Sequence, residues 1–311
     1  MQNNISSLDH YDFIRVSGAD TLSFLQGQLS CNTELLSPQR SLRGALCNLK
    51  GRVVADFRLL ALGDDCLLQC AQGMASTILA TLSKYAVFSK VTLEQLDKGV
   101  DASPNALGLS AANVDAALGA LGLTLPESTD AVSEGEACSV IRLSGTAKRI
   151  ELWFHNASAK ANFLSSTDFA LSEDLLAWER ADIETGVIHV TKELSEEYTP
   201  QLLNYDISGL IDFKKGCYTG QEIVARMYYR GTAKKRLYLA GANADVSAQS
   251  RVVKEGEPDS TGFEILRYSN SEGSSLFLTI LASEAVEAGE KFLLSDQPGS
   301  ELRIQSLPYG D

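Results

Sequence analysis

Apolar residues recur along the first hundred residues with the spacings of alternating strands and helices. Residues 11–16 (YDFIRV) predict a strand. The helix predicted next begins at Asp20, a good capping residue, and carries three leucines at helical spacing, Leu22, Leu25 and Leu29. Residues 43–62 predict a β-hairpin, because Gly51 can adopt the positive φ that a tight turn needs. Three further elements are predicted, a strand at 66–71, a helix at 74–85 and a strand at 87–93.

The rest of the chain divides into a mixed region and an all-β region. Strands are predicted at 140–143 and 150–154. Helices are predicted at 111–121, near 157–166, and from Ser172 to about Thr185, where Gly186 can end the helix. After residue 236 only short strand patterns remain, at 237–242, 262–268, 276–282, 291–294 and 302–307. Short strands separated by turn residues predict a small antiparallel barrel or sandwich.

The composition narrows the class of protein. The 311 residues are 44% hydrophobic and 22% charged, as in soluble globular proteins, and the formal net charge is −13. So acidic a chain argues against direct nucleic-acid binding and against a polybasic membrane anchor. It shows neither a membrane-spanning apolar run nor a signal-peptide pattern, which predicts a cytoplasmic protein without a membrane partner. Because no heptad seam is present, we expect a monomer.

The cysteines do not form a metal-binding pattern. There are six of them, without a C-x-x-C pair, and only three histidines, so no metal site is predicted. In a reducing cytoplasm we expect free thiols. Five are interpreted as small buried hydrophobic residues, Cys31, Cys47, Cys66, Cys70 and Cys138.

The sixth cysteine lies in an unusual basic segment, residues 214–236. This segment has seven basic residues and one acidic residue, which fits either an anion site or a solvated helix face. The anion-contact candidates are Lys214, Lys215, Arg226 and Arg230. Thr219 and Glu222 match a capping box, so a helix is predicted to begin there. Cys217 then precedes a helix N-terminus beside cations, a setting that favours the thiolate and predicts a reactive cysteine.

Residues 215–222 (KGCYTGQE) resemble the K-G-C-Y-x-G-Q-E signature of the YgfZ family. That family is related to the T-protein of the glycine cleavage system, an aminomethyltransferase that uses tetrahydrofolate. The matching signature residues are Lys215, Gly216, Cys217, Tyr218, Gly220, Gln221 and Glu222. Further resembling segments are 17–30 (SGADTLSFLQGQLS), 84–92 (KYAVFSKVT), 199–204 (TPQLLN) and 307–310 (LPYG). The resemblance covers nearly the whole chain.

The resemblance implies a fold and a domain division. The expected fold is α+β, a T-protein-like ring of two α/β subdomains with antiparallel sheets plus a small C-terminal β-barrel. The folate-binding region would span 1–230, with its second subdomain at roughly 97–185, and the barrel would span 231–311.

The resemblance also assigns folate-binding residues. Trp178 matches a tryptophan that lines the folate pocket, and Tyr11 falls where relatives carry a tryptophan, so its ring would stack on the folate. Glu184, at the end of the same predicted helix as Trp178, is a candidate acceptor for pterin ring nitrogens. The expected cofactor is tetrahydrofolate or a one-carbon derivative, and a transient iron–sulfur cluster is a further candidate.

The leading interpretation is a folate-binding accessory factor for iron–sulfur cluster assembly or repair. It would support iron–sulfur enzymes that thiolate tRNA, with Cys217 as a functional thiolate. True aminomethyl transfer is disfavoured, because T-proteins carry adjacent acidic residues in a strand where this chain has Ala55 and Asp56. Asp56 is instead expected to face solvent or to pair with Arg52 or Arg58. The alternatives are a folate-dependent one-carbon transferase with Cys217 as nucleophile and, more remotely, a tRNA-binding protein.

Overall fold

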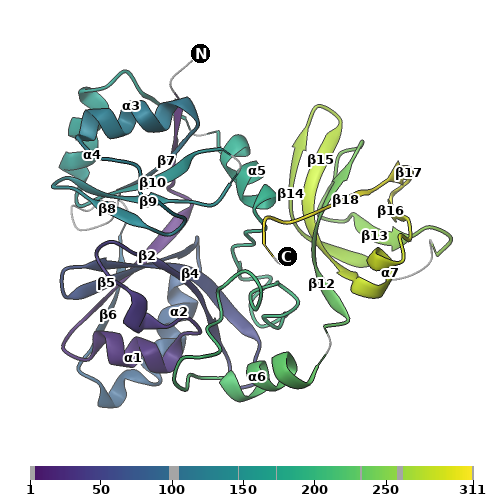
Figure 1. The fold of residues 1–311 in the computed structure, drawn as a ribbon, viewed down its shortest axis with the longest axis horizontal. Coiled ribbons are helices and arrows are strands. Elements are labelled where there is room, and N and C mark those ends of the chain that lie inside the picture. The colour runs from purple at the N-terminus through teal and green to yellow at the C-terminus, as the bar shows by residue number, and fades with distance from the viewer. Residues whose placement is uncertain are drawn as a thin grey trace. The chain divides into compact units, whose positions relative to one another are not determined.

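The computed structural model describes residues 4–97, 105–145, 147–172, 174–231, 233–257 and 262–309. The chain forms two compact units, both drawn in Figure 1. The first unit comprises Met1–Leu175, His189–Glu197 and Gly209–Gln221, and the second comprises Leu176–Ile188, Tyr198–Ser208 and Glu222–Asp311. Each unit is therefore assembled from segments that are far apart in the sequence. The predicted domain boundaries, 1–230 and 231–311, remain a prediction.

One sheet of the first unit has five antiparallel strands in the order β3-β4-β5-β2-β6. Its strands are β2 (Tyr11–Ser17), β3 (Leu42–Cys47), β4 (Val53–Leu62), β5 (Asp65–Ala71) and β6 (Thr92–Leu96). The accompanying helices are α1 (Thr21–Gln28) and α2 (Ala75–Ser83), with short 3-10 turns η1 (Thr33–Leu35) and η2 (Ala86–Phe88). Alternate strand residues such as Ile14 and Leu68 pack with Leu25 and Ile78 of the helices into one apolar core. The predicted hairpin is confirmed, and Gly51 has a φ of 71° at its turn.

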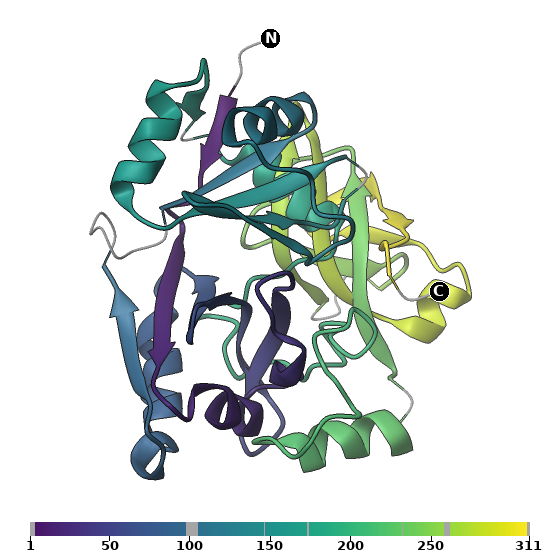
Figure 2. The ribbon, with the colours of Figure 1, turned by 60° about the vertical axis from the view of Figure 1, so that its left-hand side comes forward.

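The other sheet of the first unit has six strands in the order β11-β1-β7-β10-β9-β8. Its strands are β1 (Asn4–Ser7), β7 (Asn105–Ser110), β8 (Val132–Glu134), β9 (Cys138–Arg142), β10 (Arg149–Phe154) and β11 (Ala170–Ser172). Only the β1–β11 pair among these described strands is parallel. Helices α3 (Ala112–Leu121) and α4 (Ala157–Ser165) pack on one face, where Leu107, Ile150 and Phe163 are buried. The chain passes from β1 of this sheet directly into β2 of the other, as Figure 2 shows.

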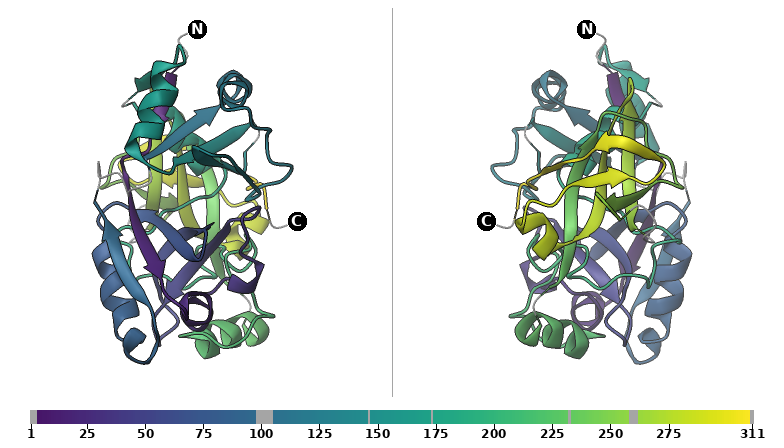
Figure 3. Two further views of the ribbon diagram at one scale, coloured as in Figure 1. Left: turned by 90° about the vertical axis from the view of Figure 1, so that its left-hand side faces the viewer. Right: turned by 90° about the vertical axis from the view of Figure 1, so that its right-hand side faces the viewer.

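The second unit contains a curled sheet of seven strands, in the order β17-β16-β13-β14-β15-β12-β18 (Figure 3). Its strands are β12 (Lys235–Ala242), β13 (Arg251–Lys254), β14 (Phe263–Ser271), β15 (Ser274–Ala282), β16 (Phe292–Leu294), β17 (Gln297–Glu301) and β18 (Arg303–Gln305). The two edge strands, β17 and β18, follow one another in the chain with only Leu302 between them. This connection brings the edges close together, so the sheet is a nearly closed barrel around Phe277 and Phe292. The predicted antiparallel barrel is confirmed.

Two further helices belong to the second unit in whole or in part. Helix α5 (Leu176–Glu184) packs against β14 and β15, and it ends before Gly186, whose φ is 73°. Helix α6 (Gln221–Arg230) begins one residue before the chain enters the second unit. Among the described residues, no helix is both long enough and apolar enough to cross a bilayer.

Several local predictions were wrong, among them the start of the helix expected from Ser172, which lies in β11 while the helix begins at Leu176. The strand expected at 87–93 begins only at Thr92, and Phe88 is 99% exposed in η2, so its apolar character does not reflect burial in a sheet. Helix α7 (Ser283–Glu287) was missed because five residues are too few to show a helical period. Asp20 does not cap α1 with its side chain, which instead accepts a hydrogen bond from the Lys90 amide at 2.7 Å.

Gly310 of the resembling LPYG segment lies outside the described residues.

Candidate functional site

Cys217 differs from the other cysteines in its exposure to solvent. It is exposed, whereas the other five are buried free thiols. Burial raises the pKa of Cys31, Cys47, Cys66 and Cys138 to about 12 and also raises the pKa of Cys70. The five buried thiols are therefore neutral and inaccessible at physiological pH, as the sequence predicted. Within the described residues, no group of three His, Cys, Asp or Glu side chains could hold a metal ion.

Lys215 anchors the segment that carries Cys217. Its buried ammonium donates three hydrogen bonds to backbone carbonyls at the end of α1, namely to Gln26 at 2.7 Å, Leu29 at 2.6 Å and Cys31 at 2.9 Å. Carbonyls at a helix C-terminus lack intrahelical donors and carry the negative end of the helix dipole, so a cation is favoured there. Burial lowers the pKa of Lys215 from 10.5 to about 8.

This arrangement leaves Lys215 without a free donor for a ligand. All three protons of its ammonium are committed to the three carbonyls, so we assign it to the anchor rather than to an anion contact. Of the other anion-contact candidates, Lys214 is exposed beside it in the first unit. Arg226 and Arg230 are exposed on α6 in the second unit, where Arg226 pairs with Glu222 at 2.7 Å.

Three more contacts hold the same segment against the first unit. The Asp212 amide donates to the Ser30 carbonyl at 2.9 Å, and the Thr219 amide donates to the Gly27 carbonyl at 3.2 Å. Gly220 has a φ of 82°, and a Cβ there would lie 2.3 Å from the Asn48 carbonyl oxygen, so only glycine fits. The segment is therefore fixed on both sides of Cys217.

Two neighbours of Cys217 in the signature contrast in environment. Tyr218 is buried, which raises the pKa of its phenol, and its ring lies under the Lys215 ammonium at 5.2 Å. Gly216 is exposed, and a Cβ there would meet open space. Residues 216 and 217 are therefore exposed to solvent, although they lie between the buried residues Lys215 and Tyr218.

The predicted capping box does not form, although the helix begins where it was expected. The Thr219 hydroxyl donates to the Gln28 side chain at 3.0 Å rather than capping α6. The Gln221 side chain accepts from the Tyr218 amide at 3.3 Å, and Glu222 is occupied by Arg226. The Thr219 hydroxyl therefore helps to hold this segment against α1 through Gln28. Local sequence spacing does not reveal this contact, because the two residues are far apart in the chain.

Tyr11 is buried at the start of β2 and contacts His189, a residue that the sequence analysis did not connect with it. Its hydroxyl lies 2.9 Å from Nε2 of His189, and the two rings meet edge to face with centroids 5.1 Å apart. His189 has a φ of 54°, an uncommon conformation for a residue with a side chain.

Asp56, which was expected in solvent or paired with arginine, is buried and accepts from the Val190 amide at 2.6 Å.

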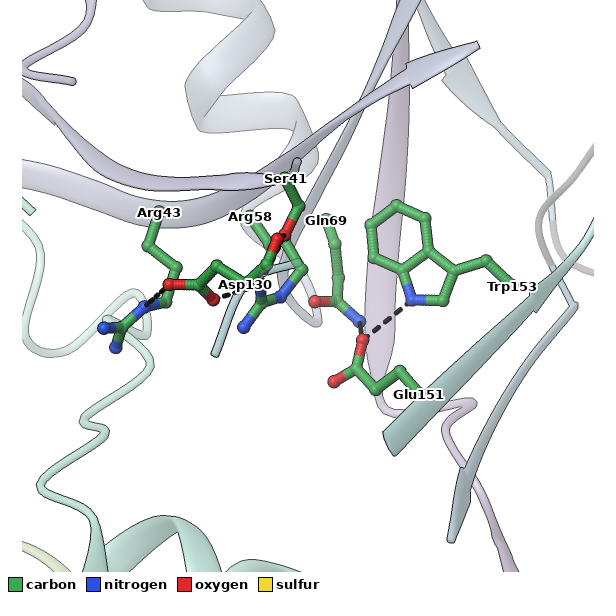
Figure 4. A network of polar contacts seen from close by, with 7 residues as sticks. All are labelled: Ser41, Arg43, Arg58, Gln69, Asp130, Glu151 and Trp153. Carbon is green, nitrogen blue, oxygen red and sulfur yellow. Dashed lines mark hydrogen bonds and ion pairs between the residues drawn. The ribbon is translucent and has the colours of Figure 1, made fainter. Parts of the chain in front are cut away.

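A polar seam joins the two sheets of the first unit (Figure 4). The strand register aligns Phe13, Gln69, Arg58 and Arg43 in one row across the face opposite the helices. From the other sheet, Glu151 accepts from Gln69 at 3.0 Å and from the Trp153 indole at 2.7 Å. Asp130, from the loop before β8, meets both arginines. These residues are scattered in the sequence, and only the strand register reveals their row.

The charges in the seam stabilise one another. Asp130 lies 2.6 Å from Arg58 and 3.2 Å from Arg43. Burial alone would raise the pKa of Asp130, but the two arginines outweigh it and lower that pKa. Burial likewise opposes the charge of Arg58, but Asp130 and then Glu151 outweigh it, so the pKa of Arg58 is raised. Both groups therefore remain charged.

Trp178 and Glu184 lie on α5 in the second unit. Trp178 is buried on this helix, together with Asp182 and Ile183. Asp182 pairs with Arg267 of the barrel at 3.3 Å, which fixes the helix to the sheet. Glu184 is exposed and pairs with Arg180 at 3.3 Å. Among the predicted site residues, Trp178, Glu184, Glu222, Arg226 and Arg230 share this unit, whereas Tyr11 and residues 214–221 belong to the first.

Each unit also has a cavity away from these residues. One of about 750 Å³ lies in the first unit, beside the start of α1 and the β4–β5 turn. One of about 510 Å³ lies in the second unit, where Arg236, Tyr238 and Tyr309 contribute to its wall. No predicted site residue lines either cavity.

Comparison with known proteins places the chain in a family. No family model matches it. A protein named tRNA-modifying protein YgfZ from Photorhabdus laumondii is 30% identical over 308 residues, covering 97% of this chain and 91% of that protein. A relative of the same name from Pectobacterium carotovorum is 28% identical over 306 residues, covering 97% of this chain and 90% of that protein.

A solved structure shows the same fold. Glycine cleavage system aminomethyltransferase T from Bartonella henselae superposes with a TM-score of 0.78 at 17% identity, covering 98% of this chain and 85% of that one. This likeness confirms the predicted T-protein-like α+β fold. From its sequence similarity to the named relatives, we conclude that the chain belongs to the YgfZ family.

Proposed function

We propose that this protein is a tetrahydrofolate-binding accessory factor for iron–sulfur cluster assembly or repair, with Cys217 as its functional thiolate. In this role it supports iron–sulfur enzymes that thiolate tRNA. The observation that carries the proposal is the single exposed thiol, held in a segment that Lys215 and Gly220 fix against the first unit. The name of its relatives, tRNA-modifying protein, and its likeness to an aminomethyltransferase fold support the same role.

The aromatic residues assigned to folate are chemically suited to it. Trp178 and Tyr11 offer planar rings on separate elements, and both are shielded from water, as stacking on a pterin or benzoyl ring requires. Tyr11 also has a polar partner in His189, so its ring orientation is set before any ligand arrives. Glu184 stays a candidate acceptor for pterin ring nitrogens, and it would have to leave Arg180 to play that role.

The thiols bear on the iron–sulfur part of the proposal. Five of the six cysteines are enclosed, so the described chain offers one accessible thiolate ligand where a four-thiolate cluster needs four. A resident cluster therefore does not fit this chain. A cluster or sulfur species in transit, with its remaining ligands supplied by a client enzyme, does fit.

The first test is anaerobic calorimetry with reduced tetrahydrofolate. We expect saturable one-to-one binding by the wild type and clear weakening by Trp178→Ala. Phe88→Ala is the matched control, because it removes an aromatic ring that is fully exposed in η2. A well-folded wild type that binds no folate would refute the folate proposal.

The second test concerns Cys217 in cells that lack the native gene. We expect Cys217→Ser to lower the content of thiolated tRNA nucleosides, measured by mass spectrometry, while the buried-site control Cys66→Ala supports normal levels. Full thiolation with Cys217→Ser would refute the functional role of this thiol. Turnover of a folate one-carbon adduct by the purified protein, abolished in Cys217→Ser, would instead favour the folate-dependent transferase.

A further inference from the structure

The turn around η2 exposes a group of large apolar side chains to solvent. Phe88 is 99% exposed, Val87 is 74% exposed and Tyr85 is 37% exposed. Scattered apolar residues are normal on a protein surface, whereas a contiguous exposed group marks an interaction site. Phe88 contributes nothing to the core of its own unit, so folding does not explain its presence.

The same turn is held firmly against the first unit. Ala86 and Val91, on either side of the most exposed residues, pack against the core of the five-stranded sheet. The Lys90 amide donates to the Asp20 carboxylate at 2.7 Å, which fastens the turn to the start of α1. Phe88 is therefore presented in a fixed position, and a side chain on a preorganised turn loses little freedom when it binds.

Positive charge flanks the exposed apolar residues. Lys84 and Lys90 are exposed on either side of them, and residues 84–90 (KYAVFSK) include no acidic residue. Neither ammonium forms an ion pair within the described part of the chain, and the nearby Asp20 carboxylate is engaged by the Lys90 amide. A partner that matches this turn therefore offers an apolar pocket for Phe88 with carboxylates at its rim, the usual arrangement of an apolar centre and a polar rim.

The charges also distinguish between kinds of partner. A second copy of this chain, bound through the same turn, would set Lys84 and Lys90 against their own counterparts, which repel them. An anionic membrane would repel a chain whose net charge is −13. A different protein needs only a few carboxylates around its pocket, so it incurs neither penalty.

Helix α1 connects this turn to the segment of Cys217. The helix begins directly after Asp20, which binds Lys90, and the carbonyls at its C-terminal end hold Lys215. Its eight residues span about 12 Å, whereas an ordinary interface of about 800 Å² on each partner is roughly 30 Å across. Figures 1 and 2 show the turn, in blue, and α1, in purple, at the same lower end of the first unit. A protein docked on Phe88 therefore lies within reach of the exposed thiol.

We propose that the turn at residues 84–90 is the docking site for the iron–sulfur client enzyme, which receives Phe88 in an apolar pocket rimmed by carboxylates. This inference rests on the proposed function, because the docked protein is the client that Cys217 serves. Phe88 is the anchor of the contact, and Lys84 and Lys90 attract the acidic rim of the pocket.

The first test is photo-crosslinking in cells that lack the native gene, with p-benzoylphenylalanine in place of Phe88. We expect a cross-linked product that mass spectrometry identifies as an iron–sulfur enzyme that thiolates tRNA. Leu171, which is 47% exposed on β11, is the matched control position and should give no such product. Absence of such an enzyme among the products from position 88, or an equal yield from position 171, would overturn the proposal.

The second test uses Phe88→Asp, with Leu171→Asp as its control. We expect Phe88→Asp to lose at least ten-fold in affinity for the purified cross-linked enzyme, as the removal of a central apolar anchor does, and to lower the content of thiolated tRNA nucleosides in the same cells. Its urea unfolding midpoint and its affinity for tetrahydrofolate should not change, so the loss reflects docking alone. Leu171→Asp should support normal thiolation.

The outcomes separate this inference from the proposed function. If Phe88→Asp supports full thiolation while Cys217→Ser does not, the docking site is overturned and the function of the thiol stands. If neither variant impairs thiolation, both proposals fail. A wild-type dimer, or wild-type binding to phosphatidylglycerol vesicles, that Phe88→Asp abolishes would identify a second copy or a membrane as the occupant and would also overturn the inference.

Discussion

Replacing Lys215 by methionine removes the anchor of the Cys217 segment while keeping a side chain of similar length. The ammonium makes three charge-assisted hydrogen bonds, which together contribute roughly 5–9 kcal/mol to folding. Keeping a charge at this buried position costs about 3 kcal/mol, as judged from a pKa lowered from 10.5 to about 8. The net loss of unfolding free energy should therefore be on the order of 2–6 kcal/mol.

The measurement combines global and local readouts. Urea unfolding at pH 7 gives the free energy of unfolding, and the rate of Cys217 alkylation by iodoacetamide reports on the segment itself. Lys214→Met is the matched control, because it removes the same charge from an exposed neighbour whose ammonium makes no hydrogen bond within the described chain. We expect the control to stay within about 0.5 kcal/mol of the wild type, as surface substitutions usually do.

The opposite pattern would refute the reasoning. If Lys215→Met unfolds within 0.5 kcal/mol of the wild type, on the order of a neutral surface change, the three carbonyl contacts contribute little to stability. If Cys217 is alkylated at the same rate in both proteins, the anchor does not control how the thiol is presented. Lys215→Arg should recover only part of the stability, because the cage of three carbonyls suits a compact ammonium.

Three further predictions follow from burial and close contact. Four of the buried thiols have a pKa of about 12 in the folded chain against 9.0 when unfolded, so the free energy of unfolding should fall above pH 9 by up to about 1.4 kcal/mol per pH unit for each thiol. The lowered pKa of Lys215 acts in the opposite direction, but only between pH 8 and 10.5. Urea unfolding at a series of pH values should therefore show a maximum of stability near pH 8–9. Alkylation of the folded protein at pH 8, followed by mass spectrometry, should modify one cysteine quickly and the others only after unfolding; rapid labelling of a second site in the folded state would contradict the burial described here. Gly220→Ala should lower the unfolding free energy by roughly 2 kcal/mol or more, because its Cβ would lie 2.3 Å from a backbone oxygen and its φ is positive, whereas Gly216→Ala in open space should cost far less.

Much of the fold could be predicted from the sequence because local patterns and burial agree there. The hairpin of β3 and β4 and five of the strands after residue 236 were located from alternation and turn residues alone, whereas β13 and β17 were not predicted. The exposed run at Val87 and Phe88 misled the prediction, since apolar residues were taken as buried without evidence of a partner surface. Burial is decided by the whole fold, and a short apolar run does not reveal it.

The site was predictable only where its chemistry is local. The burial of five cysteines and the different setting of Cys217 followed from sequence context, and the structure adds that Cys217 is exposed. The pairing of Tyr11 with His189 joins residues 178 positions apart, and the seam of Arg58 with Asp130 joins residues 72 apart. Neither pairing has a local signature, because each joins a strand residue to a distant connecting segment that meets it only in the folded chain. Glu151 and Asp130 would have needed knowledge of the tertiary fold to be found.

The three oxygens that hold Lys215 belong to the main chain and not to side chains. Any residues at positions 26, 29 and 31 can supply them, provided that α1 ends in the same conformation. The contact itself therefore places no demand on the side chains at these three positions, which are constrained instead by their own packing and hydrogen bonds, whereas it does demand the lysine of the signature. One half of this contact would be visible as an invariant residue, and the other half would leave no trace in an alignment.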